Sequence, residues 1–256
     1  MNRQIMKSMG TKRIPNDRLT SLLQTFALKH SAKALPELLE TADMENASYK
    51  QFLLAMLETE VIGRNERRRK RNLSAAHFPP GMHPLEEFDP DELDSGITQA
   101  QLDKLKTLSW LDNGGNVVLA GPPGLGKTMI AVGLGLHAIN NGYTVCFEKM
   151  VSLVKILDNA ETERTAGFRL KNLKKAQLII IDEIGYTPIT RSQANRFFTF
   201  ISDTYETSSI IFTTNKEITD WAEMMGDPVL TTALLDRILH HAKCYSFKGE
   251  SYRLKH

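Results

Sequence analysis

The sequence is poor in cysteine, in tryptophan and in long apolar runs. Its 256 residues include two cysteines, Cys146 and Cys244, and two tryptophans. Two cysteines cannot form a disulfide framework, and these two lack metal-ligand spacing, so both are expected to be buried thiols in a reducing compartment. No apolar run approaches the roughly 18 residues that a membrane span needs, and the N-terminus lacks the apolar core of a signal peptide. These absences exclude disulfide-bonded and membrane-spanning classes and predict a soluble, cytoplasmic protein that has no membrane partner.

The net charge of the chain is small, but positive and negative residues are unevenly distributed along it. The formal net charge is +2. Residues 1–77 hold fourteen Lys and Arg against eight Asp and Glu, which gives +6, whereas residues 78–256 hold eighteen against twenty-two, which gives −4. The asymmetry indicates that the N-terminal part meets a polyanion, although basic surfaces with no nucleic-acid role are also common.

The main motif is a Gly-rich segment between a strand pattern (116–120) and a helix pattern (127–140). It fits G-x-x-x-x-G-K-[ST] without a mismatch and consists of Gly121, Pro122, Pro123, Gly124, Leu125, Gly126, Lys127 and Thr128. The glycines fall where the backbone must turn sharply, and N–H groups at the helix N-terminus can bind a polyphosphate. Lys127 would reach the β- and γ-phosphates, and the Thr128 hydroxyl would ligate Mg²⁺.

A second motif is the apolar run 178–181, which ends in the carboxylates of Asp182 and Glu183. Two charges at the end of a buried strand are poorly explained by packing, because ligands bind at the carboxyl edge of a parallel sheet. This segment looks like a Walker B motif. Asp182 would hold Mg²⁺ directly or in its second shell, and Glu183 would orient and polarise the attacking water.

Two further positions are candidates for the same chemistry. Asn215 follows the apolar strand pattern 210–214 and is placed to hydrogen-bond the γ-phosphate or the water, although Asn also favours ordinary turns at strand ends. Arg237 lies in a predicted helix and could reach the nucleotide of a neighbouring subunit as an arginine finger. An ion pair with Asp236 is the alternative for Arg237, but adjacent residues do not face each other on a helix.

The N-terminal part predicts a small helical domain after an irregular lead-in over 1–15. One helix begins at Asn16 or Asp17, a second covers 35–41, and a third opens at Ser48 with a capping-box pattern to Gln51. The third helix is expected to bury Phe52, Leu53, Met56, Leu57 and Val61. A proline-rich break follows at 77–84. The predicted organisation is therefore a basic helical domain for DNA or partner binding (1–77), a linker (78–97) and an ATPase domain (98–256).

The third helix continues into a dense basic run. Its cationic residues are Arg64, Arg67, Arg68, Arg69, Lys70 and Arg71. Such side chains can follow a phosphate backbone or only face water. Nucleic-acid contact is the favoured interpretation, because clustered like charges repel each other and a solvated face has no need of them.

Strand and helix patterns alternate along the rest of the chain. The predicted strands are 116–120, 144–148, 178–182, 210–214 and 243–247, and the predicted helices are 98–111, 127–140, 151–159, 191–205, 219–225 and 229–241. This alternation predicts an α/β fold with a parallel sheet covered by helices on both faces.

Together these strings resemble the AAA+ ATPases, and more narrowly the transposition helper ATPases of the IstB type, which are close to the DnaC helicase loaders. The most specific strings are Gly226-Asp-Pro-Val-Leu230 and Leu235-Asp-Arg-Ile-Leu-His-His-Ala242. The resemblance implies an AAA+ P-loop three-layer sandwich with a five-stranded parallel sheet, and an ATP- and Mg²⁺-dependent regulator of transposition. Such a regulator forms a homo-oligomer on duplex DNA, hydrolyses ATP and recruits a partner transposase. In this sequence only residues 248–256 follow the last strand pattern, so a helical lid with its arginine is expected to be absent or vestigial.

Two other functions remain open. A replicative helicase loader would carry the same ATPase motifs but would prefer single strands and bind a helicase. A small-molecule kinase would use the same phosphate loop, yet it generally needs an acceptor pocket and a basic lid, and the segment Gly185-Tyr-Thr-Pro188 offers no clear one.

Overall fold

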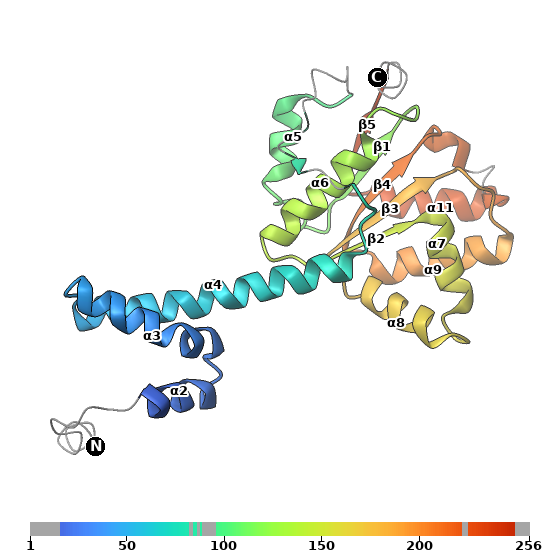
Figure 1. Cartoon of the computed structure of the whole chain (residues 1–256). Coiled ribbons are helices and arrows are strands. Elements are labelled where there is room, and N and C mark those ends of the chain that lie inside the picture. The colour runs from blue at the N-terminus through green and yellow to red at the C-terminus, as the bar shows by residue number, and fades with distance from the viewer. Residues whose placement is uncertain (1–15, 82–83, 86–87, 89–95, 222–224, 249–256) are drawn as a thin grey trace. The chain divides into compact units, whose positions relative to one another are not determined.

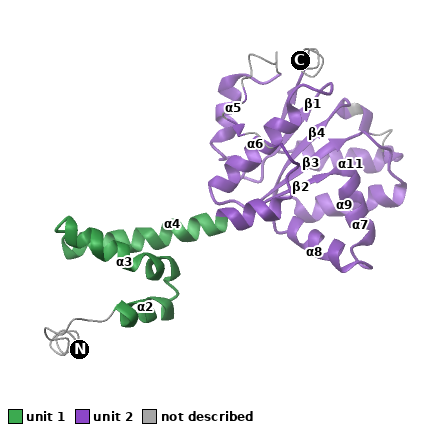
Figure 2. Cartoon of the chain, in the orientation of Figure 1, with its two compact units in different colours: residues 1–68 green, residues 69–256 purple. Residues whose placement is uncertain are grey.

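The computed structural model describes residues 16–81, 84–85, 88, 96–221 and 225–248 (Figure 1). The chain divides into two compact units, residues 1–68 and 69–256 (Figure 2). The division falls inside one long helix, α4 (Tyr49–Ala76), whereas the proline-rich break at 77–84 begins where that helix ends. The predicted lead-in over 1–15 and the tail after residue 248 lie outside the described residues.

Unit 1 contains α2 (Asn16–Thr25), α3 (Lys29–Met44) and the first part of α4. All three predicted helices are present, and α3 is longer than the predicted 35–41. The capping box of α4 has formed, because Ser48 N donates to Gln51 Oε1 at 2.8 Å and Gln51 N donates to Ser48 Oγ at 3.3 Å.

The apolar face predicted for the third helix is only partly buried. Leu53, Leu57 and Val61 are 51%, 45% and 56% exposed, so their predicted burial is wrong. The reason is the side on which α3 packs: Ser31 Oγ donates to Met56 O at 2.7 Å, and a Cβ added to Gly63 would lie 2.2 Å from the His30 ring. A cavity of about 240 Å³ remains in this unit, lined by Leu19, Leu22, Leu23, Phe26, Leu35, Leu39, Phe52 and Met56.

Unit 2 is built on a parallel sheet of five strands. The strands are β1 (Asn116–Ala120), β2 (Val145–Lys149), β3 (Leu178–Ile184), β4 (Ser209–Thr214) and β5 (Ala242–Ser246), and their order is β2-β3-β4-β1-β5. Each lies within two residues of its predicted bounds at either end. The predicted α/β class is confirmed.

The helices of unit 2 mostly follow the predicted alternation. They are α5 (Gln99–Lys106), α6 (Lys127–Asn140), α7 (Met150–Asn159), α8 (Arg164–Leu173), α9 (Arg191–Thr204) and α11 (Pro228–Leu239), with a short 3₁₀ turn η2 (Ile218–Asp220). The helix α8 was not predicted. The helix predicted over 98–111 ends at Lys106, and Leu108 then adopts a φ of +58°. The helix predicted over 219–225 falls partly on residues outside the described part. The described residues there are η2 and the helical residues Trp221 and Met225.

Two core clusters cover the two faces of the sheet. Successive residues of β3 alternate between them: Leu178 and Ile180 pack in the cluster that includes Ile130 of α6, and Ile179 and Ile181 pack in the other. The second cluster contains buried side chains of α7, α8, α9 and α11. A helix layer on each face of a parallel sheet makes the three-layer sandwich that the resemblance implies.

One cysteine departs from the prediction. Cys146 is buried, as expected, but Cys244 is exposed. Cys244 lies on β5, which pairs with β1 and is an edge strand of the sheet that the described residues form. An edge strand has a neighbour on one side alone, so its side chains are less completely covered.

Candidate nucleotide site

The loop between β1 and α6 has a backbone that only glycine adopts easily. Gly121, Gly124 and Gly126 have φ angles of +143°, +83° and +78°. A Cβ added to Gly121 would lie 2.3 Å from the carbonyl oxygen of Phe247, so no larger residue fits there. Helix α6 begins directly after Gly126 and has no side-chain cap on its first N–H groups. Uncapped N–H groups at a helix start can receive an anion such as phosphate.

Lys127 lies inside this loop and is buried. Its Nζ donates to the carbonyl oxygens of Gly121 at 2.6 Å and Pro122 at 2.5 Å. Burial lowers the pKa of Lys127 to about 8, and the charge of Asp182 opposes this shift. The ammonium is therefore held within the loop by weak neutral acceptors, which the charged oxygens of a phosphate can replace.

Two hydroxyl side chains from different elements converge on one oxygen of Asp182. Thr128 Oγ1 donates to Asp182 Oδ1 at 2.8 Å, and Thr213 Oγ1 donates to the same atom at 2.5 Å. Asp182 is only 2% exposed. A hydroxyl and a carboxylate are hard oxygen ligands of the kind that Mg²⁺ takes, usually with phosphate and water completing the shell. The donor set at Thr128 and Asp182 therefore fits Mg²⁺ bound together with a nucleotide.

A bulge at the end of β3 directs the two carboxylates. The pairing of β3 with β4 shifts register between Ile181 and Ile184, and Glu183 adopts a φ of +62°. Glu183 N donates to Thr213 Oγ1 at 3.0 Å, so one hydroxyl on β4 holds both Asp182 and the Glu183 backbone. Bulges and left-handed backbone of this kind re-aim side chains next to functional sites.

The Glu183 carboxylate is half exposed and paired with a cation that the sequence had not singled out. Lys149 Nζ lies 3.1 Å from Glu183 Oε1 and 3.1 Å from Oε2. Lys149 is the last residue of β2, the strand next to β3. Because all five strands are parallel, β2 and β3 bring the two side chains to the same edge of the sheet.

Asn215 comes directly after β4, and its side chain is exposed. This strand lies between the strand that leads to the phosphate loop and the strand that ends at the acidic pair, because β4 pairs with β1 on one side and with β3 on the other. Asn215 therefore follows the strand that separates Lys127 from Glu183. This order brings the end of β4 between the strand ends that lead to the phosphate loop and to the acidic pair.

Arg237 lies on α11, and its described contacts are not with the phosphate loop. Its Cζ is 4.6 Å from the ring centre of Phe198 on α9, and its Nη1 donates to Ala233 O at 3.1 Å. Among the described residues it has no bond to the loop or to the acidic pair. Its described contacts thus lie on α9 and α11.

This site can be compared with those of known proteins. The family model "IstB-like ATP binding protein" matches residues 21–256. The chain belongs to the IstB-like ATP-binding family. The ATP-binding protein described for insertion sequence IS21 of Pseudomonas aeruginosa is 40% identical over 237 residues, which is 93% of this chain and 89% of that protein. Its counterpart for insertion sequence IS5376 of Geobacillus stearothermophilus is 37% identical over 216 residues, or 84% and 85% of the two chains.

Solved structures resemble this IstB-like chain in fold. The crystal structure of the DnaC helicase loader matches with a TM-score of 0.52 and 19% identity and covers 70% of this chain and 99% of that one. The AMPPCP-bound DnaA from Aquifex aeolicus matches with a TM-score of 0.53 and 17% identity over 70% and 54% of the two chains. The AAA+ fold expected from the sequence is thus confirmed.

The basic run of this IstB-like chain lies on α4 and is mostly exposed. Arg64, Arg67 and Arg68 have the spacing i, i+3, i+4, which puts them on one helix face. Arg68 donates to Asn65 Oδ1 at 3.2 Å. The remaining predicted DNA contacts, Arg69, Lys70 and Arg71, continue the same helix.

Arg64 has a structural partner as well. Its Nε donates to Glu60 Oε1 at 2.7 Å and its Nη2 to Ala27 O at 2.9 Å. The buried Glu60 carboxylate also accepts from the N–H groups of His30 and Ser31 at the start of α3. Burial raises the pKa of Glu60, but these hydrogen bonds outweigh it and leave the pKa below its ordinary value. Arg64 thus supports the packing of unit 1, whatever else it contacts.

Sequence reasoning missed two residues that shape the site, Thr213 and Lys149. The sequence contained a feature that could have identified Thr213, because a hydroxyl residue next to the end of a buried strand lies at the ligand-binding edge of a parallel sheet. Lys149 had a weaker one, a charged residue ending the strand pattern of 144–148. Neither signal names the partner, since Asp182 and Glu183 are more than 30 residues away along the chain.

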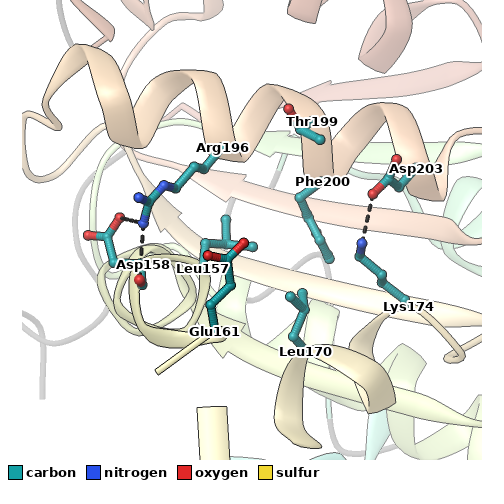
Figure 3. Close-up of a pocket in the computed structure, with 9 residues that line it drawn as sticks. All are labelled: Leu157, Asp158, Glu161, Leu170, Lys174, Arg196, Thr199, Phe200 and Asp203. Atoms are coloured by element: carbon teal, nitrogen blue, oxygen red, sulfur yellow. Dashed lines mark hydrogen bonds and ion pairs between the residues drawn. The ribbon is translucent and has the colours of Figure 1, made fainter. Parts of the chain in front are cut away.

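A separate hollow lies among α7, α8 and α9 and has a volume of about 200 Å³ (Figure 3). Four of its five charged side chains pair with each other, Arg196 with Asp158 at 2.9 Å and Lys174 with Asp203 at 2.7 Å, and the fifth is Glu161. These pairs hold helices together and leave the hollow without a strong charge of one sign. None of the described helices is long and apolar enough to cross a membrane.

Proposed function

We propose that this IstB-like protein is an ATP-hydrolysing regulator of transposition that assembles on duplex DNA and recruits or stimulates a partner transposase. The observation that supports hydrolysis is the convergence of Lys127, Thr128, Asp182 and Glu183 on one edge of the sheet. The similarity to proteins of insertion sequences supports the link with transposition.

In the proposed reaction Lys127 leaves the carbonyl oxygens of its own loop and binds the β- and γ-phosphates of ATP. Thr128 and Asp182 would hold Mg²⁺, which supplies charge neutralisation on the phosphates. Glu183 orients the attacking water and accepts its proton, which requires the carboxylate to leave Lys149. Asn215 donates a hydrogen bond to the γ-phosphate or orients the same water.

The fifth group of the proposed site comes from a neighbouring subunit. Arg237 of one chain would stabilise the charge on the γ-phosphate bound by the next, so that turnover depends on assembly. Residues 1–77, with the basic run on α4, would supply the contacts to duplex DNA or the partner. Cations on a helix follow the phosphate backbone without reading sequence.

The test is ATP turnover of the full chain with duplex DNA, with single-stranded DNA and with candidate metabolites. We expect stimulation by duplex DNA alone, and at least about a hundredfold loss of turnover in Glu183→Gln, because a positioned base contributes at least that factor. Lys127→Ala should lose nucleotide-dependent assembly.

A pull-down distinguishes the competing functions. Capture of the transposase of the same insertion sequence supports the proposal. Tight binding of a replicative helicase with no affinity for duplex DNA would instead identify a helicase loader. Stimulation by a metabolite, with formation of a phosphorylated product, would identify a small-molecule kinase.

A further inference from the structure

The guanidinium of Arg237 lies over an aromatic ring, and among the described residues it pairs with no acid. Its Cζ lies 4.6 Å from the centre of the Phe198 ring, and one of its nitrogens donates to Ala233 O one turn earlier on α11. A guanidinium has five N–H donors, and the others have no further partner among the described residues. The side chain is therefore fixed by two weak contacts and keeps both its full charge and most of its donors.

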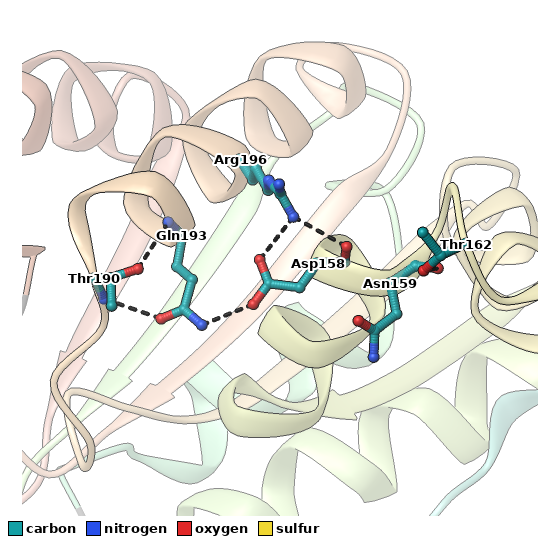
Figure 4. A network of polar contacts seen from close by, with 6 residues as sticks. All are labelled: Asp158, Asn159, Thr162, Thr190, Gln193 and Arg196. Carbon is teal, nitrogen blue, oxygen red and sulfur yellow. Dashed lines mark hydrogen bonds and ion pairs between the residues drawn. The ribbon is translucent and has the colours of Figure 1, made fainter.

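The ring itself belongs to a helix that is anchored near both ends. Near the N-terminus of α9, Gln193 Nε2 donates to Asp158 Oδ2 at 2.7 Å, and Arg196 Nη1 donates to Asp158 Oδ1 at 2.9 Å (Figure 4). Near the C-terminus, Asp203 pairs with Lys174 at 2.7 Å (Figure 3). Both anchors tie α9 to the segment that contains α7 and α8.

The helix that carries Arg237, α11, is bonded to α9 and packs against it. The ends of α9 and α11 are joined by a hydrogen bond of 3.0 Å between the Tyr205 hydroxyl and His240 Nδ1. The buried faces of the two helices share one core cluster, with Phe197 and Phe200 from α9 and Leu234 and Ile238 from α11. The packing of α9 against α11 thus holds Phe198 and Arg237 beside each other, with no acid of the described part of the chain paired to Arg237.

We propose that Phe198 is the positioning residue of Arg237: its ring orients the guanidinium toward the nucleotide of the neighbouring subunit and leaves its N–H donors free for phosphate. This inference rests on the proposed role of Arg237 as a finger in trans. A carboxylate in the place of Phe198 would neutralise the charge and use the donors. A ring attracts the cation through its quadrupole and does neither.

Mixtures of inactive chains test this, because they separate the subunit that gives the finger from the one that receives it. Glu183→Gln chains cannot hydrolyse their own ATP but still present Arg237, and Arg237→Ala chains keep an intact site but present no finger. Mixed one to one, they should recover turnover. Phe198→Leu is then added to either chain in turn, and ATP-analogue-dependent assembly of each mixture is followed by light scattering.

On the Glu183→Gln chain, which gives the finger, Phe198→Leu should lower the recovered turnover about tenfold, the effect of a cation–π contact of moderate strength. On the Arg237→Ala chain it should change nothing. Phe198→Tyr keeps a ring and should restore turnover, and Thr199→Ala, an exposed neighbour on α9, is the matched control.

Each remaining outcome overturns the inference. Equal losses on the two chains would mean that Phe198 only supports folding or assembly, and no loss on either would mean that Arg237 needs no platform. In both cases the finger itself survives, since the simple mixture has recovered turnover. If the mixture without Phe198→Leu recovers no turnover at any ratio, Arg237 does not act in trans. The proposed role of Phe198 is then wrong as well.

Discussion

Lys127 combines a lowered pKa with a task that needs its charge. Burial lowers the pKa of Lys127 to about 8, against the opposing charge of Asp182, so the neutral form grows as the pH rises past that value. Phosphate oxygens bind the ammonium form. ATP binding should therefore take up a proton above pH 8, and affinity should weaken by up to about tenfold per pH unit there. Titration of ATP binding between about pH 7 and pH 9 measures this.

The matched control is Lys127→Arg, because a guanidinium stays charged throughout this range. Its affinity should be lower but independent of pH. A decline of equal slope in Lys127→Arg would assign the titration to another group.

A second prediction concerns the side chain of Lys149. It holds both oxygens of Glu183 at 3.1 Å, and the two side chains are 49% and 42% exposed. Lys149→Met should release the carboxylate and raise basal ATP turnover by up to about fivefold, since exposed ion pairs contribute about 0.2–1 kcal/mol. KM for ATP should not change, because Lys149 has no described contact with the phosphate loop.

Lys106→Met is the control for Lys149, because it removes an ion pair of the same type, with Asp103 at 3.6 Å on α5. It should leave turnover unchanged. A fall in turnover in Lys149→Met would mean that Lys149 assists the reaction and does not restrain it.

The chemistry-bearing residues were easier to predict than their geometry. Lys127 and Asp182 were found because a short motif specifies the loop and an apolar run specifies the strand. The φ of +62° at Glu183 was not predictable, since it depends on a hydroxyl of Thr213, which lies 30 positions further along the chain. The ring of Phe198 beneath Arg237 was missed for the same reason, because the pairing exists only once α9 and α11 have packed.

Among the helices and strands, α8 carries a buried cation, Arg169, that joins it to β2 and to the end of α4. Arg169 donates to Glu148 Oε1 at 2.6 Å and to Phe147 O at 2.9 Å at the end of β2. It also donates to Ala75 O at 2.8 Å and Ala76 O at 3.3 Å, the last carbonyls of α4. These carbonyls have no partner within the helix, so Arg169 caps α4 and fixes its end within unit 2.

Removal of this cation should cost much of the stability of unit 2. The Arg169 and Glu148 side chains are 8% and 11% exposed, and breaking a buried pair by removing one partner costs about 3–5 kcal/mol. Urea unfolding of Arg169→Met followed by tryptophan fluorescence measures this, because Trp110 and Trp221 both lie in unit 2.

The double variant Arg169→Met with Glu148→Met is the control for this network. It removes both charges, so it should recover a large part of the lost stability. If the double variant is as unstable as the sum of the two single ones, the charges do not act as a pair and the capping of α4 carries the effect.

The buried Arg169 also explains why α8 was not predicted from the sequence, whereas the strands were. The buried residues of α8 are Ala166, Arg169 and Leu173, whereas its large apolar residue, Phe168, is 66% exposed. An arginine on the inward face interrupts the apolar pattern, which is limited to Ala166, Leu170 and Leu173. By contrast β1 and β3 are buried on both faces and read as continuous apolar runs, which is why their positions were predictable.

In the molecule as a whole, the excess of basic residues and the nucleotide-site motifs lie in different parts of the sequence. The nucleotide residues all lie within residues 78–256, which carry −4, whereas residues 1–77 carry +6. Basic charge outside the phosphate loop and the acidic pair has no evident task in hydrolysis. It fits the proposal that DNA is bound through α4 and that the ATPase site responds to assembly.

The salt dependence of duplex binding tests this division. Arg67 and Arg68 are exposed on one face of α4, so replacing both with Ala should weaken binding equally for all sequences. The slope of log affinity against log salt should fall in magnitude by about 2, because each lost phosphate contact removes about 0.9. Lys50→Ala, an exposed cation of α4 outside the run, should leave the slope unchanged.

Arg64 should behave differently from its two neighbours. Because it bonds Glu60 and Ala27 O, Arg64→Ala should speed hydrogen exchange at the start of α3 as well as weaken DNA binding. Fluorescence anisotropy with labelled duplex at several salt concentrations gives the slopes. An unchanged slope in the Arg67 and Arg68 double variant would mean that the run only faces water, and the DNA contacts would then have to be sought on unit 2.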